Sequence, residues 1–472
     1  MAQVNEQNTR IGQDFSLPQL IRFAMPAILT TVCGQLFRSL DDGLFLSRYA
    51  GETALAAINL LVPVNCLVMG FAQLFSIGAC TLSAQKMGEG KFDEARRIFT
   101  RICIVAASVG LFVALVMNLF CRPICIFLGA DETLLPDAMS FVRIVVSNTA
   151  VNLLCGVFAG YYSTAGRPDM GLLCSVLNGA TNVLLDIVFV AWKGWGVVGS
   201  SLSTAIGELV IFIVGVIFFT RKKNEIHFCA PKGMYVSTAV AASRSGFAQF
   251  INSISLSLTS FVSNHTLLAI LGPLGVSASS VIGHLRQLLT AAFIGYVGCV
   301  GPIIAYNYGS KNVPRLKKIL THNLKFWFFG TLGLTVLGQL LRKVLIGIFI
   351  VKEKSPELYE LAYTGLTIEF FACMFTAGCI FVMRMFVALG APHTAAILTT
   401  SRNFIIRLTM LLLLPRLFNE IGVWLAFPVA EFLSFIVAVV LVVVNADNYG
   451  YGKSGVAWRI LPAGTKVPRE QD

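Results

Sequence analysis

The chain contains long apolar runs without charged side chains, of which residues 102–120 are an example. A helix needs roughly 20 such residues to cross the hydrocarbon core of a bilayer, which is about 30 Å thick. The other structure that can span a membrane is a closed barrel, whose strands alternate in polarity, and these runs do not alternate. Because 56% of the 472 residues are hydrophobic and 13% are charged, the sequence predicts an all-α polytopic membrane protein.

The apolar runs and the breaks between them predict about twelve transmembrane helices in two groups of six. A basic linker, residues 221–236, separates an N-lobe at 1–220 from a C-lobe at 237–445, and a polar tail at 446–472 follows. The predicted helices lie near residues 17–47, 53–84, 93–121, 133–163, 168–192, 197–220, 237–271, 275–306, 313–350, 356–388, 393–415 and 420–445.

The two halves resemble each other. Residues 84–88 and the basic residues after them match residues 305–309 and theirs, and we interpret each copy as a basic loop between two apolar segments. Gly166-Arg167-Pro168 matches 390–392, a helix stop followed by a helix start. Because six is an even number, the second half enters the membrane in the same orientation, so the repeat is parallel and pseudo-symmetric. A transporter of this kind usually works at the seam between its halves.

The distribution of the basic residues predicts the orientation of the chain. The formal net charge is +12, and most of the lysines and arginines outside the predicted helices fall on one side. By the positive-inside rule, both termini and residues 86–101, 221–244 and 311–325 are expected in the cytoplasm. Residues 1–15 do not have the form of a cleavable signal peptide. We therefore expect a multi-pass protein of the cell inner membrane, and no nucleic-acid partner.

Cysteine and histidine do not form a recognisable metal-binding pattern. The twelve cysteines are scattered through the apolar runs, and the five histidines are equally dispersed. We expect buried, reduced cysteines and no cofactor, apart from a bound sodium ion if sodium is the coupling ion.

The predicted helix at 168–192 carries a polar stripe. Asn178, Asn182 and Asp186 follow at intervals of four, which places them on one face of a helix that must point into the bundle. A charged group at mid-bilayer costs at least about 2.5–3.5 kcal/mol, so it needs a partner, a water-filled cavity or a function. Asp186 could exchange a proton or hold a sodium ion together with amide and hydroxyl oxygens. The alternative is an interhelical hydrogen-bond cluster with a structural role.

The first predicted helix contains two adjacent acids. Asp41 and Asp42 lie three and four residues after Arg38, so a local ion pair is one interpretation for either acid. Adjacent residues point about 100° apart on a helix, so one aspartate can face a cavity while the other faces elsewhere. Pro26 lies upstream on the same helix and is the most plausible hinge, although a proline usually means only a kink.

Other polar residues divide between the halves. Ser201, Thr204 and Glu208 share one face of the sixth predicted helix, and the repeat places Glu431 at the position of Glu208. For Glu208 a functional and a structural role remain open, whereas for Glu431 we favour a structural one. The repeat offers no counterpart of Asp186, so chemistry is expected mainly in the first half. For four charged residues of the second half we expect mutual ion pairing: Glu369, Arg384, Arg402 and Arg407.

No catalytic motif occurs in the sequence. A GxSxG elbow, a P-loop and an HExxH pair are all absent, so we do not expect an enzyme. Without a P-loop, transport would draw on an ion gradient or on the gradient of the substrate itself.

An ordered set of motifs covering nearly the whole chain resembles the multidrug and toxin extrusion (MATE) family, in its bacterial and archaeal branch. No single motif is decisive, but the set is fairly specific. The residues that carry the resemblance are Asp42-Gly43-Leu44-Phe45, Gly51 with Ala54 and Ala57, Ala165-Gly166-Arg167-Pro168, Asn182 with Asp186, Gly196 with Gly199 and Thr204, Pro302 with Tyr306-Asn307-Tyr308-Gly309, and Ala388 with Gly390.

The resemblance implies a two-lobed antiporter that expels cationic or amphiphilic compounds in exchange for protons or sodium ions by alternating access. It assigns ion coupling to Asp42, Asp186, Asn182 and Thr204 and a bending role to Pro26. Gln35 would line the N-lobe cavity, where we also place Asn178, Asp41 and Glu208. The seventh predicted helix has no acid at residues 249–271, so the C-lobe cation site of another family branch is expected to be missing.

Two other functions remain open. A flippase for a lipid-linked sugar would share the architecture but usually has a basic cavity, which Arg402 and Arg407 could supply and the N-lobe acids argue against. A membrane-embedded enzyme would need a cluster of acids, bases or metal ligands at one membrane face, and none is evident. The expected partners are small cationic substrates, the coupling ion and the bilayer, and we expect a monomer.

Overall fold

The computed structural model describes residues 9–40, 62–350 except for positions 129, 131, 133, 232 and 234, and 355–446. These residues are helical apart from short turns, and no strand occurs among them. Within the described part of the chain, eight helices are long and apolar enough to cross a membrane, or up to ten if each of two bent helix pairs is one span. The predicted all-α polytopic fold is confirmed.

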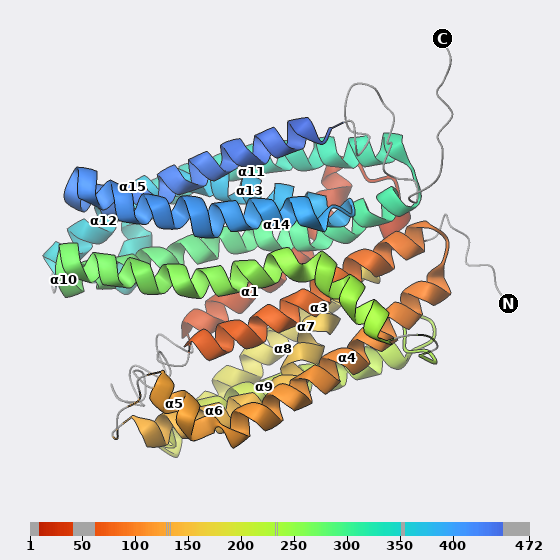
Figure 1. The fold of residues 1–472 in the computed structure, drawn as a ribbon, viewed down its shortest axis with the longest axis horizontal. Helices are drawn as coiled ribbons and strands as arrows, with labels where there is room; N and C mark the ends of the chain where they lie inside the picture. The colour runs from red at the N-terminus through yellow and green to blue at the C-terminus, as the bar shows by residue number, and fades with distance from the viewer. Residues whose placement is uncertain are drawn as a thin grey trace, which may run out of the picture.

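The first half of the chain forms most of the lower group of helices in Figure 1. Its helices are α1 (Leu17–Leu40), α3 (Val62–Gly88), α4 (Phe92–Leu119), α5 (Cys121–Phe127), α6 (Leu135–Ser147), α7 (Thr149–Thr164), α8 (Pro168–Asp186), the π-helical η4 (Ile187–Trp192) and α9 (Gly196–Thr220), after a short 3₁₀ turn η2 (Arg10–Gly12).

The second half forms the upper group, from green to blue in Figure 1. Its helices are α10 (Tyr235–Gly309), α11 (Val313–Phe349), α12 (Pro356–Phe370), α13 (Ala372–Ala388), α14 (Pro392–Thr400), the π-helical η5 (Ser401–Ile406) and α15 (Arg407–Val444).

Two of these helical runs are too long for a single membrane crossing. At 1.5 Å per residue, the 75 residues of α10 would extend for about 110 Å if straight. The backbone of α10 leaves the helical region at Gly272 (φ 64°), and that of α15 does so at Asn419 (φ 51°). Divided at these two points, the described helices follow the order of the predicted ones. The predicted segments 41–47 and 53–61, and the tail from 447 onward, lie outside the described residues.

Two predicted helices are bent, which the sequence did not indicate. The predicted helix at 133–163 is α6 and α7, which meet at 51°, and the one at 356–388 is α12 and α13, which meet at 47°. Each break is one residue long, so the apolar periodicity on either side hides it. The short helix α5 was also not predicted.

The first pair of repeats ends in equivalent turns. The amide of Gly90 donates to Met87 O and that of Lys311 to Tyr308 O, and both turn residues have positive φ, 78° and 58°. The prediction that 84–88 and 305–309 are loops is wrong. They are the last helical turns of α3 and α10, because the turn itself takes only the three residues that follow each copy.

The second pair of repeats is the predicted helix stop and start. Gly166 and Gly390 both adopt the left-handed conformation, with φ of 68° and 72°. The amide that follows each glycine donates back to a carbonyl in the last turn of the preceding helix, at 2.8 Å in both copies. Pro168 and Pro392 then begin α8 and α14.

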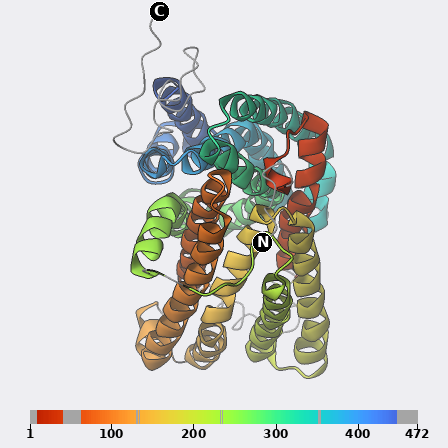
Figure 2. The same cartoon turned by 90° about the vertical axis from the view of Figure 1, so that its right-hand side faces the viewer.

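Within each half the helices pack mainly on one another, and α1 and α3 pack on α10 across the seam. Figure 2, which views the molecule from its right-hand end in Figure 1, shows the orange-to-yellow helices grouped below the teal-to-blue ones. Glycines allow the closest contacts. A Cβ added at Gly78 would lie 1.9 Å from Ala242 O, and one added at Gly246 would lie 2.0 Å from Leu74 O. Any larger residue would push these helices apart.

The repeats also meet each other across the seam. A Cβ on Gly88 would lie 2.1 Å from Tyr306 O, and one on Gly309 would lie 2.2 Å from Gln85 O. Gly88 and Gly309 are equivalent positions, as are Gln85 and Tyr306, so the contact is reciprocal, as a pseudo-twofold axis requires. We call the end of the bundle that holds these contacts and the four repeated turns the turn end.

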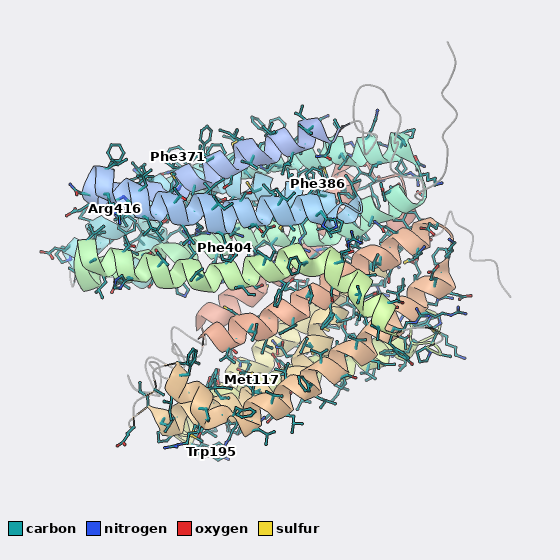
Figure 3. All side chains as sticks on the ribbon, viewed as in Figure 1. Met117, Trp195, Phe371, Phe386, Phe404 and Arg416 are labelled. Atoms are coloured by element: carbon teal, nitrogen blue, oxygen red, sulfur yellow. The ribbon has the colours of Figure 1, made fainter. Side chains whose placement is uncertain are left out.

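The outer surface is apolar over the length of the helices (Figure 3). Leu119, Phe371 and Val443 are each more than 60% exposed. Exposed apolar side chains in such numbers are incompatible with water on all sides and fit a protein surrounded by lipid.

Candidate substrate and ion site

The polar stripe of α8 lies beside α1. Ser175 Oγ of α8 donates to Thr30 O of α1 at 3.0 Å. One turn further along, a Cβ on Gly179 would lie 2.1 Å from the ring of Phe37, so only glycine permits this approach of the two helices. The close packing brings the end of α1 to the part of α8 that carries Asn178, Asn182 and Asp186.

Asp186 is completely buried, with 0% of its surface exposed, although it is an acid. It is the last residue of α8, and the backbone continues directly as the π-helix η4. A π-helical turn holds one residue more than an α-helical turn, and such turns are frequent at functional sites. The side chain therefore lies where the chain departs from regular helix, inside the bundle.

Asn182 connects the stripe to the next helix. Its Nδ2 donates to Thr204 Oγ1 of α9 at 3.1 Å, and Asn182 is only 8% exposed. Asn182 lies one helical turn before Asp186 on the same face of α8, and the bond joins the Thr204 hydroxyl to this stripe. A carboxylate, an amide oxygen and a hydroxyl are hard oxygen donors of the kind that hard cations prefer.

Glu208 lies one turn beyond Thr204 on α9 and has amide partners. Its two carboxylate oxygens accept hydrogen bonds from the Nδ2 atoms of Asn148 and Asn152. Asn148 is the residue at the break between α6 and α7, so the half-buried Glu208 carboxylate contacts the bend. Asn178 packs on the same stretch of α9, since a Cβ on Gly207 would lie 2.7 Å from Asn178 Oδ1.

Gln35 lies at the seam between the lobes. Its Nε2 donates across the seam to Gln287 Oε1 of α10, at 3.4 Å. This long hydrogen bond joins a residue predicted to line the N-lobe cavity to a residue of the other half.

Pro26 lies away from these groups, toward the turn end. Its carbonyl accepts a hydrogen bond from Thr30 Oγ1 at 2.8 Å. Pro26 also lines a hollow of about 310 Å³ together with Arg10, Arg22 and Asp169. The hollow is thus separate from the polar stripe of α8. The two acids predicted on the first helix, Asp41 and Asp42, lie outside the described residues.

The charged residues of the second half form ion pairs, with partners that the sequence did not identify. Arg402 of η5 meets Glu431 of α15 at 3.0 Å, and both are buried. Arg286 of α10 pairs with Glu369 of α12. Arg286 was missed, although it is the one Lys, Arg, Asp or Glu in the predicted helix at 275–306 and the cost of an intramembrane charge could have found it.

Arg384 and Arg407 differ from the expectation of mutual pairing. Among the described residues, no carboxylate lies within 4 Å of either guanidinium group. Arg407 instead lies over the ring of Phe427, 4.7 Å from its centroid. Over all the residues that the structure describes, no three histidine, cysteine or acidic side chains come together as a metal site would require.

Two lobes of long apolar helices, with the buried carboxylate of Asp186 and hydrogen-bonded amides inside one lobe, define a polytopic membrane transporter. The MatE family profile matches this chain twice, at residues 26–188 and 248–413. The matches start about 220 residues apart, as the internal repeats do. They cover well over half of the chain, which therefore belongs to the MATE family of multidrug efflux transporters. Transporters of this family are not enzymes and need no cofactor.

Curated relatives and solved structures agree with this assignment. The chain is 22% identical to the multidrug export protein MepA of Staphylococcus aureus over 441 residues, covering 91% of this chain and 94% of the relative. It is also 22% identical to the MepA protein of Staphylococcus saprophyticus, covering 92% and 95%.

The fold matches solved MATE transporters. A crystal structure of MATE in complex with MaL6 superimposes with a TM-score of 0.87 and 18% identity, covering 92% of this chain and 97% of that one. The outward-facing conformation of a MATE transporter of the MOP superfamily superimposes with a TM-score of 0.84 and 19% identity, covering 90% and 95%. The predicted family and its two-lobed helical fold are confirmed.

Proposed function

We propose that this chain is a secondary antiporter that exports cationic or amphiphilic compounds in exchange for protons or sodium ions. The observation that carries the proposal is the complete burial of Asp186 beside the Asn182–Thr204 pair. A carboxylate in a membrane interior is maintained only where it has a function or strong partners. Amide and hydroxyl groups one turn away suit a small cation or a proton.

Coupling follows if cargo and coupling ion compete for one negative site. In the ionised state Asp186, together with Asp42, attracts a cation, and Gln35, Asn178, Asp41 and Glu208 surround the organic part of the substrate. When a proton or sodium ion neutralises the carboxyls, the substrate loses its counter-charge and leaves. Such competition requires no step that hydrolyses a nucleotide.

Contacts at the turn end support a rocking motion of the lobes. Besides the reciprocal contact of Gly88 and Gly309, Lys318 of α11 pairs with Asp14 at 2.8 Å, and its ammonium group holds the pKa of that carboxyl below its usual range. Arg315 donates to Gly12 O. We infer that the turn end is closed and cytoplasmic, so that the structure represents an outward-facing state of the transporter. When the occupancy of the ion site changes, Pro26 bends α1.

The same proposal includes the placement of the protein. The transporter lies in the cell inner membrane with both termini in the cytoplasm, since the basic turns belong on that side. It acts as a monomer, because each chain contains both lobes and the seam between them.

Substitution of Asp186→Asn tests the proposed role. Efflux of a fluorescent cationic dye is measured in cells that lack other efflux pumps, after membrane insertion has been confirmed. We expect at least about a tenfold loss of gradient-driven efflux, since the amide cannot ionise. The matched control is Asp169→Asn on the same helix, whose exposed carboxylate pairs with Arg167. Wild-type efflux by the Asp186→Asn variant would refute the proposal, and collapsing the proton and sodium gradients separately identifies the ion.

A further inference from the structure

The interior of the second half contains a cluster of charged residues from four membrane segments. On α15, Arg407 lies four residues from Asn403 and from Leu411, which are 2% and 7% exposed, so it points inward. By the same spacing, Phe427 lies between the buried residues Val423 and Glu431. These side chains therefore face the inside of the lobe rather than lipid.

Arg286 approaches the same place from α10. It lies between Ile282 and Thr290, which are 1% and 9% exposed, and its guanidinium is bound by Glu369. Arg286 lies 4.1 Å from the centroid of the Phe427 ring and Arg407 lies 4.7 Å from it. One aromatic ring therefore brings two guanidinium groups together.

The charges of this cluster do not balance. Arg286, Arg402 and Arg407 contribute three positive charges, and Glu369 and Glu431 contribute two negative ones. Each carboxylate is engaged by an arginine other than Arg407. A guanidinium group stays protonated in proteins, so the excess positive charge is permanent. The ring of Phe427 offsets part of its desolvation but does not neutralise it.

One member of the cluster, Arg286, is partly exposed and lies close to the seam. The Arg286 side chain is 25% exposed, more than any other member of the two ion pairs. Its neighbour Gln287 receives the hydrogen bond from Gln35 of α1. Arg286 therefore lies at the same level of α10 as the contact with α1 across the seam.

We propose that Arg407, with Arg286 and the Phe427 ring, forms a binding site for the carboxylate of a zwitterionic aromatic amphiphile. The inference rests on the proposed export function and specifies its substrate class. The amine of the compound binds the acids of the first half, its aromatic body contacts Phe427, and its carboxylate accepts hydrogen bonds from the fork of the guanidinium group. The two lobes thus recognise opposite ends of one molecule.

A pair of dyes that differ in one group tests this site. Rhodamine 110 carries a free carboxylate, and rhodamine 123 is its methyl ester, so the second dye has the amine-bearing rings without the anionic group. Binding of each dye to the purified full-length protein is measured by fluorescence anisotropy. We expect the wild type to bind rhodamine 110 at least about threefold more tightly than rhodamine 123. Arg407→Gln should weaken the binding of rhodamine 110 about tenfold.

Controls separate the charge of Arg407 from a structural role. Rhodamine 123 should bind Arg407→Gln within about twofold of the wild type, and Arg407→Lys should retain part of the preference because it keeps the charge. Arg416→Gln, at an exposed position nine residues further along α15 (Figure 3), should change the binding of neither dye. If Arg407→Gln weakened the binding of both dyes equally, or of neither, the proposed carboxylate site would be wrong.

The outcomes also distinguish this inference from the proposed function. Suppose that the wild type binds rhodamine 123 without preferring rhodamine 110, and that Asp186→Asn no longer binds rhodamine 123. The export function then stands and the carboxylate site is wrong. If neither dye binds, both fail. Should Arg407→Gln not be recovered from the membrane, the wild-type preference alone decides, since a purely cation-selective cavity would favour the ester.

Discussion

At the scale of the residue, the buried pair of Arg402 and Glu431 shows how a membrane interior accommodates full charges. Arg402 Nε and Nη2 both donate to the Glu431 carboxylate, at 3.0 to 3.2 Å. The pair joins η5 to α15 inside the second half. Removing one partner leaves the other as an uncompensated buried charge, whereas removing both does not.

Substitution of Arg402 therefore has an asymmetric consequence. Arg402→Met should destabilise the protein by about 3–5 kcal/mol, and the double variant with Glu431→Leu should recover most of that loss. The thermal unfolding midpoint, measured on detergent-solubilised protein, reports both effects. Arg416→Met is the control, because this arginine is exposed. A double variant no more stable than Arg402→Met would contradict the argument.

Part of the polar interior could be predicted from spacing alone. The interval of four between Asn178, Asn182 and Asp186 predicts one inward face, and the structure buries Asn182 and Asp186. The same rule would have found Asn148 and Asn152, which hold Glu208. The partners themselves could not be predicted. A hydrogen bond between residues 56 or 60 positions apart depends on how two helices pack, and no local sequence pattern shows that packing.

At the scale of the element, the sequence predicts helices better than their breaks. Long apolar runs determine where a helix crosses the membrane, so the predicted starts at residues 168, 313 and 356 agree with the structure. A break of one residue changes neither hydropathy nor periodicity, which is why the bends of α6–α7 and α12–α13 were missed. The repeat at 84–88 was misassigned because glycine and lysine near a turn do not show whether the helix has already ended.

Close packing at glycines gives a prediction for one helix pair. A methyl group on Gly88 would lie 2.1 Å from a backbone oxygen of α10, so Gly88→Ala must separate α3 from α10 at the turn end. The cost of such overpacking is about 1–3 kcal/mol. We expect faster amide hydrogen exchange in residues 84–92 and 305–313, measured by mass spectrometry.

Gly298 provides the control for that experiment. It lies in α10 as well, but an added Cβ meets no atom within 4 Å. Gly298→Ala should leave the exchange of both segments unchanged. If Gly88→Ala and Gly298→Ala behave alike, contact of the two repeats does not hold the turn end closed.

At the scale of the whole molecule, two similar halves have acquired different interiors. The turns, the reciprocal glycine contacts and the two MatE matches all follow the repeat. The charged groups of the interior do not follow the repeat. The polar stripe with Asp186 occurs only in the first half, and the cluster in which arginines outnumber glutamates lies in the second. The symmetric parts provide the seam between the lobes, and the asymmetric parts give each lobe its own ligand.

The central claim is that substrate and coupling ion compete at Asp186. Its most direct test is the dissociation constant of rhodamine 123, measured on purified protein across neutral pH and over a range of sodium concentrations. For the wild type we expect weaker binding, by about tenfold, as pH falls or as sodium rises, because either ion neutralises the carboxylate. Asp186→Asn should bind weakly and without dependence on either ion. If binding to Asp186→Asn depended on pH or sodium as it does in the wild type, the claim would be contradicted.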